Sequence, residues 1–162
     1  MRKVSLVLSL FVAMLLSAVG CLSSGLESEM RSSIDLGKAA VVAKGGIIVL
    51  ELEGRGVSPI LEALDADPCA FADAVVMDRV VGRAAAAIYI VGRAREVTAL
   101  VMSEGALELL LNHGVKTRAD EIVPYIVNRR KTGMCPMDRA TLEMENPEEI
   151  VARLRQIVEK NR

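Results

Sequence analysis

Two short stretches of this chain, Ile88–Val91 and Val97–Met102, contain no charged residue and show no alternation of apolar and polar positions. A strand with one face in water alternates, whereas a strand that is buried on both faces does not. We therefore interpret both stretches as buried strands. Strands of this kind occur with helices interleaved between them, so we expect an α/β domain.

The core of this domain has to be built from small and branched side chains. The chain has 162 residues, of which 52% are hydrophobic but only 2% are aromatic. Valine, leucine, isoleucine, alanine and methionine must therefore supply the packing. A chain of this length forms one core rather than two.

A β-hairpin is predicted near the start of the domain. The β-type runs Ala39–Ala43 and Ile47–Leu52 are separated by Gly45-Gly46, and glycine adopts the positive φ of a tight turn. The segment Ser58–Leu64 then begins with a cap residue followed by proline. This pair is typical of the first turn of a helix.

Further helices and extended segments are predicted in the rest of the chain. Small residues dominate Ala74–Ala87, which we interpret as a buried central helix that lies close to the sheet. A helix from Ser103 ends near Gly114, because glycine can supply the left-handed residue that terminates a helix. The last expected elements are the strand Val115–Thr117, the extended segment Ile122–Asn128 and the helix Pro147–Lys160 with Asn146 as its cap.

The N-terminus has the pattern of a secretory signal. Arg2 and Lys3 precede the uncharged apolar stretch Val4–Leu16. Small residues then lead to Cys21, as in the bacterial lipobox, although Ala18 stands where that motif usually has leucine. We therefore expect an exported lipoprotein that is anchored in the cell membrane or envelope through a lipid on Cys21.

This interpretation divides the chain into three parts. Residues 1–20 are the signal peptide, residues 21–36 are a serine-rich flexible tether, and residues 37–162 are a single domain. Two alternatives stay open for the N-terminus. It is either cleaved as an ordinary signal without a lipid, or retained as a membrane helix.

The charge balance argues against a nucleic-acid partner. Loss of Arg2 and Lys3 leaves 20 − 2 = 18 basic residues against 21 acidic ones, a net charge of −3. Phosphate backbones are bound by positive surfaces. The chain also has no Trp, two Phe and two Tyr, which is too few for a base-stacking platform.

Three stretches resemble the domain-of-unknown-function 1893 family: Met77–Ala86, Met102–Glu104 and Asn128–Asp138. The resemblance extends from about Gly37 to Arg139. It implies a fold like that of cytidine deaminase, a three-layer α/β/α sandwich with a mixed sheet. It implies no particular activity, because members of this family have none established.

The zinc chemistry of a deaminase is not expected here. That chemistry needs a His or Cys and two further Cys at two helix starts, with a Glu to transfer protons. The corresponding positions read Asp78-Arg79-Val80 and Ser103-Glu104-Gly105-Ala106, and the only histidine, His113, lies at a helix end. We therefore expect neither a metal nor another cofactor.

A ligand pocket is still expected, because the resemblance implies two helix N-termini that meet at one edge of the sheet. Backbone N–H groups there bind anions or polar ring edges. The alternative is that these side chains act as helix caps, dipole partners and solvated charges. The candidate ligand-binding residues are Asp78, Arg79, Arg83, Ser103, Glu104, Asn128 and Arg129.

Cys135 is the candidate nucleophile. It precedes Pro136, and a helical turn that begins there would lower the pKa of the thiol. A base to accompany it is not evident, and a pair with His113 is a weak hypothesis. Cys135 is otherwise a structural cysteine, either free or bridged to Cys69.

Three functions follow from these features. The first is a non-catalytic module that binds a small polar or nucleotide-like ligand and is displayed on a membrane. The second is an enzyme that uses Cys135 in group transfer or redox chemistry. The third is a structural protein of the cell envelope. The lack of zinc ligands favours the first and the third, and only the motif around Cys135 favours the second.

Overall fold

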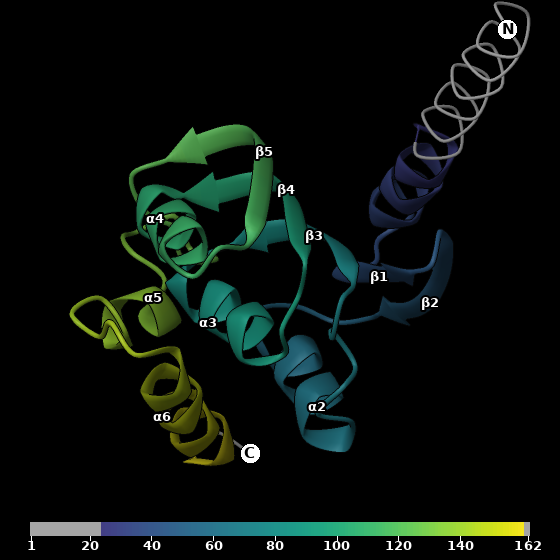
Figure 1. Cartoon of the computed structure of the whole chain (residues 1–162). Coiled ribbons are helices and arrows are strands. Elements are labelled where there is room, and N and C mark those ends of the chain that lie inside the picture. The colour runs from purple at the N-terminus through teal and green to yellow at the C-terminus, as the bar shows by residue number, and fades with distance from the viewer. Residues whose placement is uncertain (1–23, 161–162) are drawn as a thin grey trace, which may run out of the picture.

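The computed structural model describes residues 24–160 and contains one mixed five-stranded sheet (Figure 1), so the α/β class is confirmed. The strands lie in the order β2-β1-β3-β4-β5. The strands are β1 (Ala40–Lys44), β2 (Ile47–Leu52), β3 (Val75–Val81), β4 (Glu96–Ser103) and β5 (Lys116–Val123). The helices that follow them are α2 (Ser58–Ala66), α3 (Arg83–Val91), α4 (Glu104–Asn112), α5 (Pro136–Ala140) and α6 (Pro147–Lys160).

The sheet combines an antiparallel and a parallel part. The predicted hairpin of β1 and β2 is confirmed, and its turn places Gly45 and Gly46 at φ values of 59° and 85°. These positive angles are those of the hairpin turn that glycine favours. Strand β1 also pairs antiparallel with β3, whereas β3, β4 and β5 run parallel to one another.

Helix α3 is the centre of the larger core. It contacts α2, α4, α5 and α6, and every residue from Arg83 to Tyr89 is buried. The alanines 84–87 give this helix a narrow profile, so that the backbone can approach its neighbours closely. Figure 1 shows α3 between α2 and α4, over the parallel part of the sheet.

The other face of the sheet is covered by a helix over residues 24–35. Met30 and Ile34 are each 1% exposed and pack with Val41 and Met77. The side chain of Arg31 forms an ion pair with Asp120 on β5 at 2.7 Å. Residues 24–35 are therefore packed against the domain.

The expectation of a flexible tether over residues 21–36 is thus wrong for residues 24–35. The serine content suggested a linker, but Leu26, Met30 and Ile34 recur every four residues. This spacing places them on one face of a helix, where they bury an apolar stripe. The predicted lipidation site Cys21 and the predicted signal peptide lie outside the residues that the structure describes.

The prediction for residues 74–91 is wrong in both parts. The first half of the expected helix Ala74–Ala87 is strand β3, and the expected strand Ile88–Val91 is the second half of α3. Periodicity cannot distinguish a buried strand from a buried helix when a short segment is apolar throughout. Since α3 is surrounded by protein, it has no polar face to reveal its period. Gly82 marks the true boundary between the two elements.

Most other elements agree with the predictions. Helix α2 begins at Ser58 with Val57 as its cap, so Ser58 is the first helical residue and not the cap. Helix α4 ends where it was expected to end, just before Gly114, which has a φ of 73°. The side chain of Asn146 accepts a hydrogen bond from the Glu149 N–H at 2.9 Å and thus caps α6.

Two C-terminal features differ from the predictions. Strand β5 is longer than the expected strand Val115–Thr117 and extends to Val123. Helix α5 was not predicted. Among residues 24–160, no helix is long and apolar enough to cross a membrane.

Candidate functional site

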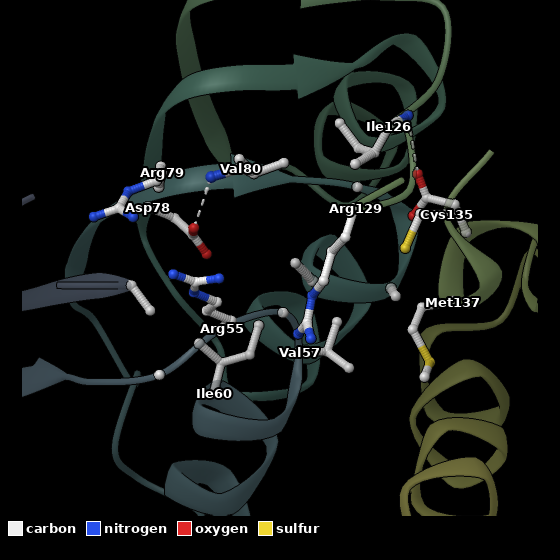
Figure 2. A pocket seen from close by; sticks show the side chains of 17 residues that line it. Arg55, Val57, Ile60, Asp78, Arg79, Val80, Ile126, Arg129, Cys135 and Met137 are labelled. Atoms are coloured by element: carbon white, nitrogen blue, oxygen red, sulfur yellow. Dashed lines mark hydrogen bonds between the residues drawn. The ribbon is translucent and has the colours of Figure 1, made fainter. Parts of the chain in front are cut away.

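A pocket of about 310 Å³ lies where the end of β3, the start of α2 and the first turn of α3 meet the segment 126–138 (Figure 2). Its volume is at the lower end of the range for small-molecule sites, about 300–1,000 Å³. Its wall includes Arg55, Val57, Ile60, Asp78, Arg79, Gly82, Ala85, Arg129, Cys135, Met137 and Asp138.

Asp78 forms part of the inner wall. It lies on β3 and is 7% exposed. Its Oδ1 accepts a hydrogen bond from the Val80 N–H at 2.9 Å, and its Oδ2 accepts one from the Tyr89 hydroxyl at 2.5 Å. Burial raises the pKa of Asp78 from 3.8 to about 6, against the opposing effect of these hydrogen bonds. The carboxyl group is therefore mostly ionised at neutral pH.

Tyr89 holds this carboxylate from the core side. The ring of Tyr89 is fully buried and meets Phe71 edge to face, with 5.2 Å between the ring centroids. Burial and the neighbouring charge of Asp78 raise the pKa of the Tyr89 hydroxyl well above its usual value. The hydroxyl therefore stays protonated and acts as the donor.

Replacement of Tyr89 by phenylalanine is expected to lower the free energy of unfolding by about 1–3 kcal/mol at pH 7.5, because an oxygen of a buried carboxylate loses its donor. The loss should be smaller at pH 4.5. Asp78 has a higher pKa in the folded state than in the unfolded state, so its contribution to stability is complete below pH 3.8 and disappears as the pH rises through about 6. Loss of the donor raises this folded-state pKa further.

Urea denaturation followed by circular dichroism at the two pH values measures this difference. Tyr125→Phe is the matched control, since Tyr125 is 43% exposed and should change stability little at either pH. An equal loss for Tyr89→Phe at pH 4.5 and 7.5 would show that Asp78 is not the group involved.

Asp138 is a second buried carboxyl group in the wall, 5% exposed, and it caps α3 from a distant segment. Its Oδ2 accepts a hydrogen bond from the Ile126 N–H at 3.4 Å, and the N–H groups of Ala84 and Arg83 also stabilise its charge. Burial nevertheless raises its pKa above the usual value. A Cβ atom on Gly82 would lie 2.2 Å from Oδ1 of Asp138, so only glycine leaves room for the carboxyl group.

Two arginines lie at the mouth of the pocket. Arg55 precedes α2 and Arg129 belongs to the segment 126–138, and both are exposed. Within residues 24–160, neither guanidinium group has an ion-pair or hydrogen-bond partner. A Cβ atom on Gly56 would lie 3.9 Å from Nη2 of Arg129, so this side chain reaches the loop that carries Arg55. Figure 2 shows Arg55 directed toward Asp78 and Arg129 directed toward Val57.

The remaining wall is apolar. Val57 and Ile60 come from the start of α2, Ala85 from α3 and Met137 from α5. The pocket therefore combines an apolar wall, two buried carboxyl groups and two unpaired cations. Such a set can hold a small molecule that has a flat apolar body, N–H donors and an anionic group.

The structure places three of the predicted ligand-binding residues in the pocket wall: Asp78, Arg79 and Arg129. Asp78 is not a helix cap, because it lies five residues before Arg83, the first residue of α3, and within strand β3. The guanidinium group of Arg79 donates to the carbonyl oxygens of Ile34 and Lys38, both at 2.9 Å. Arg79 therefore connects β3 to the end of the helix over residues 24–35.

The other predicted residues are not part of the pocket wall. Ser103 caps α4, since its hydroxyl accepts a hydrogen bond from the Ala106 N–H at 3.2 Å, and Glu104 is exposed in the first turn. Asn128 bonds to Thr132 within a turn. The N-terminus of α4 is therefore not part of the pocket, which is built at the N-termini of α2 and α3 and at the start of α5.

Arg83 explains why the second helix N-terminus does not contribute. Its guanidinium group is buried and donates to the carbonyl oxygens of Thr141 at 3.2 Å, of Gly105 at 3.3 Å and of Met144. The side chain thus occupies the space beside the first turn of α4. Its role is structural, because it connects α3 and α4 to the segment before α6.

Cys135 lines the pocket and is half-buried. Its N–H donates to the Ile126 carbonyl at 2.7 Å, which fixes the start of α5. His113 does not line the pocket, and its Nδ1 lies 2.9 Å from the carbonyl oxygen of Leu109 at the end of α4. The suggested Cys/His pair is therefore not assembled. Cys69 and Cys135 are both free, so they do not form a disulfide.

Arg55, Gly82 and Asp138 are site residues that the sequence reasoning did not identify. The glycines on either side of Arg55 were the only local signal for a special loop there. No local signal links Gly82 to Asp138. Among the described residues, no three His, Cys, Asp or Glu side chains gather in an arrangement that would hold a metal ion.

Comparison with known proteins identifies a family and a fold. The family model described as a domain of unknown function (DUF1893) matches residues 31–158. The chain is also similar to the crystal structure of a DUF1893 family protein, TM1506, from Thermotoga maritima at 2.70 Å resolution. The two share 26% identity with a TM-score of 0.73, over 83% of this chain and 88% of that chain. No match was found among the curated proteins.

Proposed function

The chain belongs to the family of domains of unknown function DUF1893, and we propose that it is a non-catalytic module that binds a small nucleotide-like ligand. The observation that carries this proposal is the pocket itself. Buried Asp78 and Asp138 line the same small cavity as the unpaired cations Arg55 and Arg129. The two carboxyl groups do not form ion pairs with the two arginines.

The two arginines support an anionic group on the ligand. Exposed arginines on a protein surface are common, but these two come from separate loops and reach the same opening. A guanidinium group binds phosphate or carboxylate through two parallel N–H bonds. The ligand's anion is therefore expected at the mouth, with its uncharged part inside.

The inner wall supports a flat apolar body with N–H donors. Val57, Ile60 and Ala85 provide apolar contact, and the carboxylate of Asp78 provides acceptors. A base or a similar heterocycle has these properties. A simple inorganic anion would use only the mouth and would make no contact with the inner wall.

Calorimetric titration of the purified domain with nucleoside monophosphates and ribose 5-phosphate tests this proposal. The double variant Arg55→Ala/Arg129→Ala is expected to weaken nucleotide binding by about 10- to 1,000-fold, since each charge-assisted contact contributes about 1.5–3 kcal/mol. Arg130→Ala is the matched control, because Arg130 is exposed and does not line the pocket. Absence of binding for every probe, or an equal loss in the control, would contradict the proposal.

A second candidate function is an enzyme that depends on Cys135, and one observation favours it: the thiol lines the same pocket. In that case Cys135 should react with iodoacetamide at pH 6 much faster than the exposed Cys69 does. A binding module instead requires only that nucleotide affinity survives in Cys135→Ala. A purely structural envelope protein would fail both tests.

Export and a lipid anchor on Cys21 remain part of the proposal for the whole protein. The helix that packs on the sheet is already formed at residue 24. A lipid on Cys21 would therefore hold the domain directly at the membrane surface. The likeness to the deaminase fold also remains a proposal, and it is compatible with a pocket for a nucleotide-like molecule.

A further inference from the structure

We infer that two copies of this chain associate through the outer edge of β5, in an antiparallel pairing that places Ala119 of each copy opposite Ala119 of the other. This inference is independent of the proposed function. It is carried by the open edge of the sheet, by the order of the charges along β5 and by the apolar surface beside this strand.

Strand β5 forms one edge of the sheet, and Figure 1 shows it as the outermost strand of the parallel part. Within residues 24–160, no strand pairs with its outer side. The N–H and C=O groups along such an edge are a template for another strand. Strand β5 contains no proline, which would interrupt this template, and Pro124 follows directly after its last residue.

The charges of β5 change sign along the strand. Lys116 and Arg118 lie in its first half, and Asp120 and Glu121 lie in its second half. A two-fold axis perpendicular to the sheet makes the edge strands of two copies antiparallel. Each half of β5 then lies beside the opposite half of the other copy, so that unlike charges meet across the interface.

One register of this pairing avoids contacts between like charges. With Ala119 on the axis, Arg118 of each copy lies directly opposite Asp120 of the other. An axis at Arg118, Asp120 or Glu121 would place that charged residue opposite its own copy, which destabilises a strand pair. The axis keeps each face of the sheet on its own side, and residues that share a face are an even number of positions apart. The registers therefore differ by whole residues, and the one centred on Ala119 is favoured.

The charged side chains of β5 remain accessible although they have partners within one copy. Arg118 forms ion pairs with Glu27 at 3.4 Å and with Glu96 at 3.2 Å, and Asp120 forms one with Arg31 at 2.7 Å. The side chains of Arg118 and Asp120 are nevertheless 55% and 51% exposed. Charges on an edge strand can also prevent pairing. Here, however, their order attracts an antiparallel copy of the same strand.

An apolar groove of about 530 Å³ lies at the end of β5. It is formed by residues of β3, β4 and β5 together with the segment 124–127. Three of its apolar side chains are 41–54% exposed, and Ile122 beside it is 44% exposed. A cluster of exposed apolar side chains marks an interaction surface. The three exposed side chains of the groove are Val80, Tyr125 and Val127.

The antiparallel pairing provides an apolar contact for this groove. It brings the end of β5 in one copy to the start of β5 in the other, where α4 also ends. Leu111 lies in the last turn of α4 and is 55% exposed. Leu111 of the second copy therefore comes close to the groove, and the two-fold axis repeats this contact. Because Val80 and Ile126 line both the groove and the pocket, the second copy would cover the outer side of the pocket wall.

Disulfide cross-linking of the full chain, read by non-reducing electrophoresis, tests the pairing. Directly opposite Cα atoms of antiparallel strands lie about 4.5–5.5 Å apart, which a disulfide can span. Ala119→Cys should therefore form a covalent dimer on oxidation with copper phenanthroline. Thr117→Cys is the matched control, since its two copies would lie about 13 Å apart along the strands. A mixture of Thr117→Cys and Glu121→Cys should again give a dimer, because these positions lie opposite each other. The unchanged chain controls for its three own cysteines.

Charge variants in the Ala119→Cys background test the electrostatic part of the argument. Arg118→Glu places two negative charges opposite each other, twice in the dimer, so the rate of cross-linking should fall by about 3- to 30-fold. Asp120→Arg added to Arg118→Glu exchanges the two charges and should restore most of the rate. Arg130→Glu makes the same change of charge away from β5 and should leave the rate unchanged.

Three results would overturn the inference. The first is absence of a dimer in both Ala119→Cys and the mixture of Thr117→Cys with Glu121→Cys. The second is an equal yield of dimer from Ala119→Cys and from Thr117→Cys alone, which would indicate random collisions. The third is a cross-link from Ala119→Cys to a different protein in place of the dimer, which would assign the edge of β5 to another partner. None of these results depends on nucleotide binding.

Discussion

Replacement of Arg83 by alanine is expected to lower the free energy of unfolding by about 3–5 kcal/mol. The guanidinium group of Arg83 is buried and bonds to the carbonyl oxygens of Thr141, Gly105 and Met144. Alanine leaves three carbonyl groups without this donor. Each buried polar group that loses its partner costs about 1–3 kcal/mol, less where water can enter.

Urea denaturation followed by far-ultraviolet circular dichroism suits this measurement, because the chain has no tryptophan. Arg155→Ala is the matched control. Arg155 forms an ion pair with Asp65 at 2.6 Å, but the two side chains are 49% and 44% exposed. Exposed ion pairs contribute about 0–1 kcal/mol, so the control should lose little stability.

Two further variants identify the source of the effect. Arg83→Met keeps most of the side-chain volume but removes the donors, so it should remain close to Arg83→Ala in stability. Glu145→Ala removes an 80% exposed partner of Arg83 and should have little effect. A loss below about 1 kcal/mol in Arg83→Ala would show that the carbonyl groups find other donors.

Replacement of Gly82 by alanine is the second large effect, with an expected loss of about 2–4 kcal/mol. The backbone of Gly82 has a φ of −96°, which any residue adopts, so backbone strain does not contribute. The loss arises from the contact with Asp138, whose Oδ1 would lie 2.2 Å from the new Cβ atom. Displacement of this carboxyl group removes the cap of α3 and its bond to the Ile126 N–H.

A double-mutant cycle tests this explanation. In Gly82→Ala/Asp138→Ala the clash is absent, so the double variant should lose less stability than the sum of the two single variants, by about 1–2 kcal/mol. Gly25→Ala is the control for a simple gain of a methyl group, because nothing lies within 4 Å of a Cβ atom there. Additive losses in the cycle would show that Gly82 and Asp138 act independently.

Local patterns were sufficient for several elements. The hairpin depends on Gly45 and Gly46, whose backbone freedom is a property of the residues themselves. The cap of α6 depends on Asn146 and Glu149, which are three positions apart. Signals of this range can be recognised in a sequence, because the atoms that interact are held together by the chain.

The candidate site was predicted only in part. Asp78, Arg79, Arg129 and Cys135 do line one pocket. The structural roles of two of them differ from the predicted ones, however. Asp78 lies on a strand and is not a helix cap, and Arg79 donates to a carbonyl oxygen of the helix over residues 24–35. Ser103 and Glu104 lie at the start of α4, where the side chain of Arg83 occupies the space beside the first turn. The sequence did not indicate this position of Arg83.

By itself, the sequence determined the α/β class, the hairpin and the helices α2, α4 and α6. These depend on runs of apolar residues, on caps and on turn glycines, all of which act over a few positions. The tertiary structure decided where β3 ends and α3 begins, because burial on all sides removes the periodicity that would distinguish them. It also decided the pocket, since Gly82 and Asp138 are 138 − 82 = 56 positions apart and meet only when the chain has folded.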